Sequence, residues 1–194
     1  FEGFYDVSQL GAITMKGVAR VPWDGNPAPR MCELTSGMMN SVGLANPGID
    51  AFVDHVGSYM DELENRGTRV IMQMAAHSVQ EMVDVVERTE ELAPHVSALE
   101  LNISCPNLAR GGTPLGATPR QAAEVMRAVR PRTTLPLLVK MAPVNVAEIG
   151  KALEAEGANG LTLINSLSGM SIDVHTRRSR LSRRAPGLGV RTGP

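Results

Sequence analysis

The feature that most constrains the fold is an alternation between short apolar segments and longer segments with helical periodicity. Five apolar segments read as buried strands, at residues 10–16, 69–75, 97–103, 135–141 and 160–165. The segments between them repeat apolar residues at helical spacing, as Val79, Met82, Val83 and Val86 do. Because the strands are apolar enough to be covered on both faces, the pattern predicts a parallel α/β sheet.

Polar residues predict where the helices between these strands begin. Asn46 precedes Pro47, a favoured first helical residue, and Ser78, Thr118 and Asn145 each stand three residues before a Glu or Gln. Residues 18–47 are rich in Pro and Gly, and we expect a long irregular connection there. A connection of that length inside a compact domain is usually functional.

Two architectures fit such a sheet, the doubly wound sheet and the (β/α)8 barrel. A dinucleotide-binding sheet would carry G-x-G-x-x-G after its first strand, and the sequence has none there. Each predicted strand instead has a polar group at or near its carboxyl end: Lys16, Gln73, Asn102, Lys140 and Asn165. In a barrel these ends share the face on which such enzymes build their sites, so the pattern favours a barrel. Two lysines at one barrel mouth would repel each other unless an anionic ligand lay between them.

Charge and cysteine content exclude several classes of function. All 20 acidic residues precede residue 174 and six arginines follow it, so the acidic body disfavours nucleic acid as the main partner. The two cysteines form neither a metal-like pair nor a disulfide framework, and no metal site is predicted. We therefore expect a reducing, cytoplasmic location. No apolar run approaches ~18 residues, so no membrane span is expected.

The segment ELNISCPN at residues 100–107 opens as a strand and then turns polar within a few residues. Asn102, Ser104, Cys105 and Asn107 surround Pro106, which cannot continue a strand ladder. The segment is either a polar strand end with an inert core thiol or a catalytic strand end, and its residues alone leave both open.

Six motifs in order resemble the dihydroorotate dehydrogenase family: the strand end at Lys16, GNPAPR at 25–30, GMMNSVGLANPG at 37–48, ELNISCPN at 100–107, LLVKM at 137–141 and INSLSGMSID at 164–173. The resemblance covers residues 1–181 and implies an FMN-dependent (β/α)8 TIM barrel, of which this chain holds about five βα units without the N-terminal start and the C-terminal strands. It leaves residues 182–194 as a disordered or non-native tail. The implied reaction is the oxidation of dihydroorotate to orotate in pyrimidine biosynthesis. We expect the chain by itself to bind FMN weakly.

The resemblance also assigns roles to residues. It makes Cys105 the base that removes a proton from the substrate, and the loop after it a lid. Implied substrate contacts are Lys16, Asn40, Val42, Gly43, Leu44, Asn102, Asn107, Asn165 and Ser166. Implied FMN contacts are Lys16, Gln73, Asn102, Lys140 and Ile164.

A cysteine base resembles the soluble class, and the segment after it resembles the NAD-linked branch more than the fumarate-reducing one. That branch pairs a homodimer of catalytic subunits with an electron-transfer subunit that carries FAD and an iron–sulfur cluster. Two alternatives stay open: another FMN barrel acting on a pyrimidine, such as dihydropyrimidine dehydrogenase or a dihydrouridine synthase, and an inactive truncated remnant kept as a binding module.

Overall fold

The computed structural model describes residues 3–93, 96–104, 114–182 and, for its backbone, 189–192. Its main element is a five-stranded parallel sheet in which the strands follow one another in chain order. The strands are β1 (Ala12–Thr14), β4 (Arg69–Ala75), β5 (Ala98–Asn102), β6 (Leu137–Lys140) and β7 (Gly160–Thr162). All five predicted strands are therefore confirmed, and the prediction for β4 has the observed bounds.

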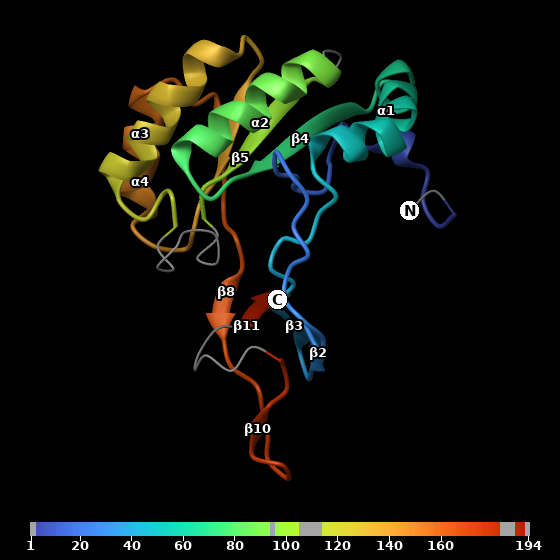
Figure 1. Cartoon of the computed structure of the whole chain (residues 1–194), viewed down its shortest axis with the longest axis vertical. Helices are drawn as coiled ribbons and strands as arrows, with labels where there is room; N and C mark the ends of the chain where they lie inside the picture. The colour runs from blue at the N-terminus through green and yellow to red at the C-terminus, as the bar shows by residue number, and fades with distance from the viewer. Residues whose placement is uncertain (1–2, 94–95, 105–113, 183–188, 193–194) are drawn as a thin grey trace.

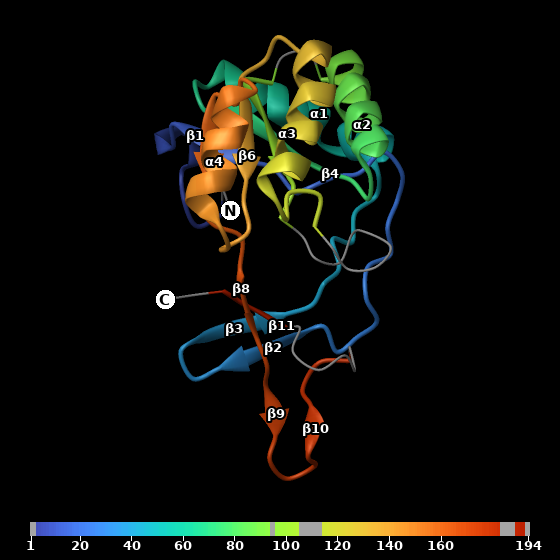
Figure 2. The ribbon, with the colours of Figure 1, turned by 90° about the vertical axis from the view of Figure 1, so that its left-hand side faces the viewer.

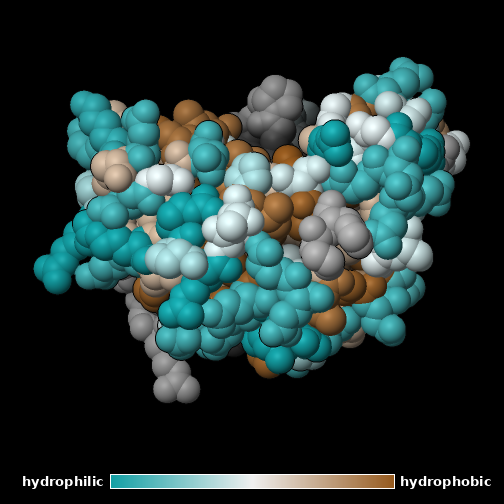
Figure 3. All heavy atoms as spheres, turned by 90° about the horizontal axis from the view of Figure 1, so that it is seen from above, coloured by the Kyte–Doolittle hydropathy of each residue, from teal (hydrophilic) through white to brown (hydrophobic). Residues whose placement is uncertain are grey.

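Four helices connect these strands and cover one face of the sheet (Figure 1). They are α1 (Ile49–Asn65), α2 (Val79–Leu92), α3 (Pro119–Val129) and α4 (Val146–Ala155); two short 3-10 helices are η1 (Val7–Gln9) and η2 (Arg130–Arg132). Alternate strand residues such as Met72, Leu99 and Leu101 are fully buried in a continuous core against the apolar faces of the helices. Seen from above, much of the outer surface is hydrophilic, with apolar groups visible between the polar ones (Figure 3).

Two of the predicted helix caps form as expected. The hydroxyl of Ser78 accepts a hydrogen bond from Glu81 N at 3.1 Å, and that of Thr118 accepts one from Gln121 N at 3.3 Å. Each bond satisfies one of the amide groups that a helix leaves without a partner in its first turn.

The cap predicted at Asn46 is wrong, and the cap predicted at Asn145 is confirmed in position but lacks its side-chain bond. Helix α1 has Gly48 as its N-cap, because the Asn46 side chain instead accepts from Ala19 N at 3.1 Å and Gly48 N at 3.0 Å. Asn145 is the N-cap of α4, but its backbone is left-handed with φ of 47° and it makes no side-chain cap bond. Capping requires the extended backbone that Ser78 adopts.

A second sheet corrects the prediction that residues 18–47 are irregular. Strands β2 (Met31–Leu34) and β3 (Gly37–Asn40) form an antiparallel hairpin, and β3 is followed in the sheet by β11 (Gly189–Thr192) and β8 (Leu167–Gly169). Strands β9 (Ile172–Asp173) and β10 (Arg178–Ser179) form a further small hairpin that extends away from the helices (Figure 2). Residues 189–192 are thus a strand where we expected a disordered tail, and the domain boundary at residue 182 stays a prediction.

The parallel sheet is curved, with the helices on its convex side. Strands β5 and β7 are separated by β6, so on a flat sheet their backbones would lie ~9.6 Å apart with side chains perpendicular to it. Yet Thr162 Oγ1 of β7 lies 2.6 Å from Glu100 Oε2 of β5. Side chains from non-adjacent strands therefore converge on the concave face, as in the wall of a barrel.

Candidate active site at the carboxyl ends of the parallel strands

The polar residues predicted at the strand ends lie at one end of the sheet, because all five strands are parallel. Asn102 ends β5, Lys140 ends β6 and pairs with Asn102 in register, and Asn165 follows β7. Gln73 lies within β4, beside Glu100 of β5, and Lys16 follows β1. The strand-end prediction thus names groups that lie toward one end of the sheet although they are far apart in the chain.

Asn102, Ser104 and Asn165 form one hydrogen-bonded cluster at this end. Asn102 Oδ1 accepts from the Ser104 amide at 3.3 Å and from the Ser104 hydroxyl at 2.9 Å. Asn165 Nδ2 donates to Ser104 Oγ at 2.6 Å and to Asn102 Oδ1 at 3.5 Å. The side-chain oxygen of Asn165, Oδ1, in turn accepts a hydrogen bond from Ser166 N at 2.8 Å. The cluster joins the end of β5 to the chain that leaves β7.

These bonds fix the orientation of the Asn102 amide. Its oxygen is used by three donors, whereas no acceptor among the described residues bonds its nitrogen. Asn102 therefore presents an N–H donor rather than a carbonyl to a ligand at this end of the sheet.

Glu100, which the strand-end argument did not single out, lies on the concave face two residues before Asn102. Its carboxylate accepts from Gln73 Nε2 at 2.5 Å and from Thr162 Oγ1 at 2.6 Å, and the residue is 3% exposed. Strand alternation could have found Glu100, because residues two apart in a strand share a face. Its partner Gln73 is the register neighbour on β4, whereas the contact with Thr162 spans β6 and depends on the curvature of the sheet. Neither partner could have been found from strand alternation alone.

The two predicted lysines differ in their surroundings. Lys140 is half-buried on β6, and no carboxylate among the described residues lies within the 4.0 Å of an ion pair from its ammonium group. Lys16 is exposed and donates to the carbonyl of Gly17 at 3.3 Å. Two strands, β4 and β5, separate β1 from β6 in the sheet, so the two ammonium groups belong to different parts of the curved wall.

The predicted substrate loop from Asn40 to Leu44 leaves the second sheet and is braced by Asn26. Asn26 Nδ2 donates to Ser41 O at 2.7 Å, and Asn26 N donates to Val42 O at 3.0 Å. Gly43 and Leu44 both have positive φ, 74° and 53°, so the chain turns sharply here. Ser41 Oγ is buried without a hydrogen-bond partner in the described part of the chain.

The second sheet connects this loop to the strand ends. Asn40 of β3 pairs with Val190 of β11, which pairs with Ser168 of β8, and β8 begins just after Ser166. In Figure 1, β8 carries the chain from the parallel sheet to the second sheet. The exposed side chain of Ile164 lies in the segment that leaves β7.

Two predicted site residues, Cys105 and Asn107, and the predicted lid after them lie outside the described residues. The structure does describe the residue before them: Ser104 immediately precedes Cys105 and is hydrogen-bonded by Asn102 and Asn165.

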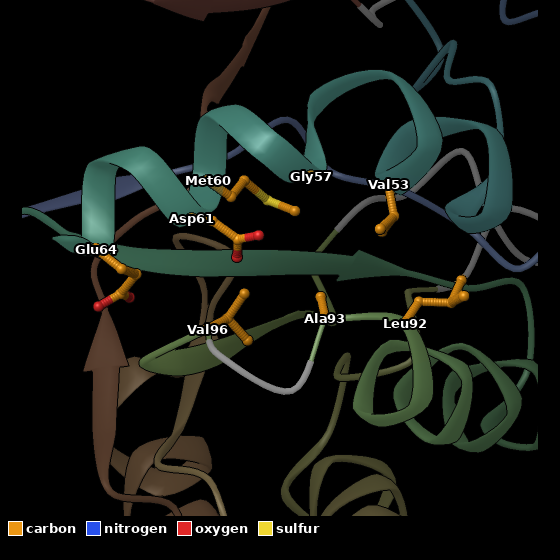
Figure 4. A pocket seen from close by; sticks show the side chains of 8 residues that line it. All are labelled: Val53, Gly57, Met60, Asp61, Glu64, Leu92, Ala93 and Val96. Carbon is orange, nitrogen blue, oxygen red and sulfur yellow. The ribbon is translucent and has the colours of Figure 1, made fainter.

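A separate pocket of about 220 Å³ lies between α1 and the chain that follows α2. Among its lining side chains are Met60, Asp61 and Glu64 of α1 and Val96 before β5 (Figure 4). The Glu64 carboxylate bonds Val70 N at the start of β4, so this pocket belongs to the amino end of the sheet, away from the predicted site residues.

The fold and the polar strand ends together define a class of protein: part of a (β/α)8-type barrel with polar groups gathered at the carboxyl ends of its strands, the face on which enzymes of this fold build their sites. A structure of dihydroorotate dehydrogenase from Eimeria tenella in complex with ferulenol has the same fold, with a TM-score of 0.66 over 89% of this chain and 53% of that one at 17% identity. The predicted partial barrel is thereby confirmed. Among the described residues, no helix is both long and apolar enough to cross a membrane.

The family follows from the sequence comparisons. The family model for dihydroorotate dehydrogenase matches residues 1–192, and the chain belongs to this family. It is 42% identical over 190 residues to the catalytic subunit of dihydroorotate dehydrogenase B (NAD(+)) from Lachnoclostridium phytofermentans, covering 97% of this chain and 62% of that protein. The same subunit from Geobacillus kaustophilus is 42% identical over 193 residues, 98% of this chain and 59% of that protein. The chain thus spans about three-fifths of the length of these relatives.

Proposed function

We propose that the chain forms the FMN- and substrate-binding part of a dihydroorotate dehydrogenase, which oxidises dihydroorotate to orotate in pyrimidine biosynthesis. Membership of the family supports this, as do relatives named as NAD(+)-linked catalytic subunits. The observation that carries the proposal is the cluster of Asn102, Ser104 and Asn165 at the carboxyl ends of the strands.

The donors of this cluster suit a pyrimidine ring. The ring edge of orotate alternates N–H groups with carbonyl oxygens, and amide side chains can bind both. Asn102 offers its amide nitrogen, which has no acceptor among the described residues. We assign Lys16, Asn40, Asn165, Ser166, Asn107 and the backbone of Val42, Gly43 and Leu44 to the same substrate.

The described residues also fit the ring of FMN. Lys140 has no carboxylate partner in the described part of the chain, and a cation there suits an electron-rich ring edge that gains negative charge on reduction. Gln73, Asn102, Lys16 and Ile164 are the other proposed contacts. Bound FMN would supply the hydride acceptor, and the chain's part is to hold and orient both rings.

We assign the proton-removing base to Cys105. A thiol suits this role, because its ordinary pKa of ~8.5 is within reach of neutrality and a donor-rich environment stabilises the thiolate. The anchoring of Ser104 by two asparagines supports the assignment, since it fixes the backbone from which Cys105 continues. A fixed base can meet the geometric demands of proton transfer better than a mobile one.

Partners follow the same proposal. The named relatives are catalytic subunits, and we propose that this chain pairs with an electron-transfer subunit that holds FAD and an iron–sulfur cluster and passes electrons to NAD⁺. We further propose a homodimer of catalytic subunits and a cytoplasmic location.

The decisive experiment is anaerobic reduction of bound FMN. The chain is incubated with FMN and either dihydroorotate or dihydrouracil, which lacks the carboxylate, and the loss of flavin absorbance is followed. Bleaching by dihydroorotate alone supports the proposal. Bleaching by dihydrouracil alone would favour the dihydropyrimidine dehydrogenase alternative, and FMN binding without bleaching by either would favour an inactive remnant.

A further inference from the structure

The carboxylate of Glu100 lies among polar side chains on the concave face, where neither the substrate nor the cofactor assignment uses it. Its neighbours along β5, Leu99 and Leu101, point to the opposite face and are fully buried against the helices. Glu100 is nearly as buried as they are, yet among the described residues no lysine or arginine nitrogen lies within 4.0 Å of its carboxylate. It is held only by two neutral donors.

Burying a carboxylate in this way contributes little to stability. Desolvation of a charged group is costly, and buried ionic groups can often be replaced by apolar residues of similar volume without loss of stability. A leucine at this position would therefore serve packing at least as well as a glutamate. The position of the Glu100 carboxylate points instead to a role in orienting a neighbouring side chain.

What Glu100 orients is the amide of Gln73. An ionised carboxylate only accepts hydrogen bonds, so it selects the nitrogen of the amide, at 2.5 Å, over the oxygen. The oxygen is then turned toward Gly17: a Cβ added at Gly17 would lie 2.5 Å from Gln73 Oε1. The glycine leaves room for the amide in this orientation, and no donor among the described residues bonds that oxygen.

Thr162 holds the carboxylate from the other side. Its hydroxyl donates to Glu100 Oε2 at 2.6 Å, across the intervening strand β6. Gln73, Glu100 and Thr162 thus form a row of hydrogen bonds over β4, β5 and β7, and Lys140, the register partner of Thr162, lies beside it on β6.

We propose that Glu100 is a positioning residue for the cofactor site: it fixes the Gln73 amide so that its oxygen, rather than its nitrogen, faces the ligand. The proposal rests on the proposed function, in which Gln73 contacts FMN. It predicts that Glu100 acts on FMN affinity through Gln73 and not through the charge of its own carboxylate.

The test is a double-mutant cycle measured by FMN titration of the purified chain. Glu100→Met should weaken FMN binding about fivefold, the value of one hydrogen bond. In a Gln73→Ala background the same change should alter the dissociation constant by less than about twofold, because the group it positions is gone. Glu100→Gln should restore affinity to within about twofold of the unsubstituted chain, since its amide oxygen can accept from Gln73 and its amide nitrogen can donate to Thr162.

A merely structural role makes different predictions. If Glu100→Met weakened FMN binding equally with and without Gln73, or if Glu100→Gln failed to restore affinity, the positioning role would be wrong. Glu64→Gln is the matched control, because Glu64 is a largely buried carboxylate at the opposite end of the same sheet. It should lower the melting temperature without changing FMN affinity.

Two further variants test the same proposal if Glu100→Met does not fold. Thr162→Val removes one support of the carboxylate, and Gly17→Ala displaces the Gln73 oxygen. Each should weaken FMN binding only when Gln73 is present, and an equal effect in the Gln73→Ala background would contradict the proposal. No FMN binding by the unsubstituted chain would overturn the proposed function itself, and this inference with it.

Discussion

Two glutamates, one at the amino end of the parallel sheet and one in the middle of β5, show how the same side chain serves different purposes. Glu64 lies at the amino end, where its carboxylate accepts from Val70 N at 2.7 Å and from the hydroxyl of Ser97 at 2.7 Å and pairs with Arg69 at 3.1 Å. Glu100 lies in the middle of β5, and among the described residues only neutral side chains bond its carboxylate.

The two ends of the sheet differ in which polar groups lack a hydrogen-bond partner among the described residues. At the amino end the Glu64 carboxylate bonds a backbone amide and a guanidinium group, so the polar groups there bond one another. At the carboxyl end the Asn102 amide nitrogen and the Lys140 ammonium group have no acceptor among the described residues. The amino end is therefore organised for stability, whereas the carboxyl end keeps donors available for the ligands that we propose.

The largest expected effect is at the carboxyl end. Cys105→Ser should slow the reduction of FMN by dihydroorotate at least about 100-fold, because a serine hydroxyl is almost never ionised near neutral pH, whereas ionisation of a thiol is within reach. The rate is measured by anaerobic stopped-flow absorbance. Cys32→Ser on β2 is the control and should leave the rate within about twofold. An unchanged rate in Cys105→Ser would remove the base assignment.

The next effect is at the amino end and concerns stability. Glu64→Ala should lower the free energy of unfolding by about 2 kcal/mol, because it leaves Val70 N and the Ser97 hydroxyl without their acceptor. Urea denaturation measures this loss, and FMN affinity should not change. A loss of FMN affinity at constant stability would reverse the comparison between the two ends.

A smaller effect is expected for Asn102. Asn102→Leu keeps the branched shape of the side chain but removes the amide donor and the oxygen that three donors share. It should weaken FMN and orotate binding about tenfold and lower stability about as much as Glu64→Ala does. Titrations with both ligands measure this. The matched control is Asn159→Leu. The Asn159 side chain accepts a hydrogen bond from Leu137 N at the amino end of β6, so this change should affect stability only.

The smallest effect is a dependence of stability on pH. Burial alone would raise the pKa of Glu64, but hydrogen bonds from Val70 N, Ser97 and Arg69 lower this pKa below its ordinary value of 4.5. The stabilisation is therefore complete above the ordinary value and is lost as pH falls through the lowered pKa of the folded state. Glu64→Gln should make the fall in stability below pH 4.5 shallower, as followed by urea denaturation at several pH values. An identical fall in both proteins would contradict this.

Most of the parallel sheet could be predicted because its signals are local. Strand segments such as residues 69–75 are apolar and bounded by turn residues, and the Ser78 and Thr118 caps need only a neighbour three positions along the chain. The hairpin of β2 and β3 was missed because short strands with a mixed exposure pattern lie among prolines and glycines. Strand β11, which pairs with β3, and β8, which pairs with β11, are both more than a hundred residues away in sequence.

The features of the candidate site likewise divide into those that the sequence predicts and those that need the tertiary structure. The sequence by itself determined which polar residues lie near strand ends, because Lys16, Gln73, Asn102, Lys140 and Asn165 each stand at or near the carboxyl end of an apolar segment. Only the tertiary structure decided that Glu100 bonds Gln73 and Thr162, and that Ser104 joins Asn102 to Asn165. Gln73 is the register partner of Glu100 on the adjacent strand, whereas the contacts of Thr162 and Asn165 join β7 and the residues after it to β5, with which β7 does not pair. Such contacts form because twisted parallel strands curve around a common axis and bring distant side chains to one concave face.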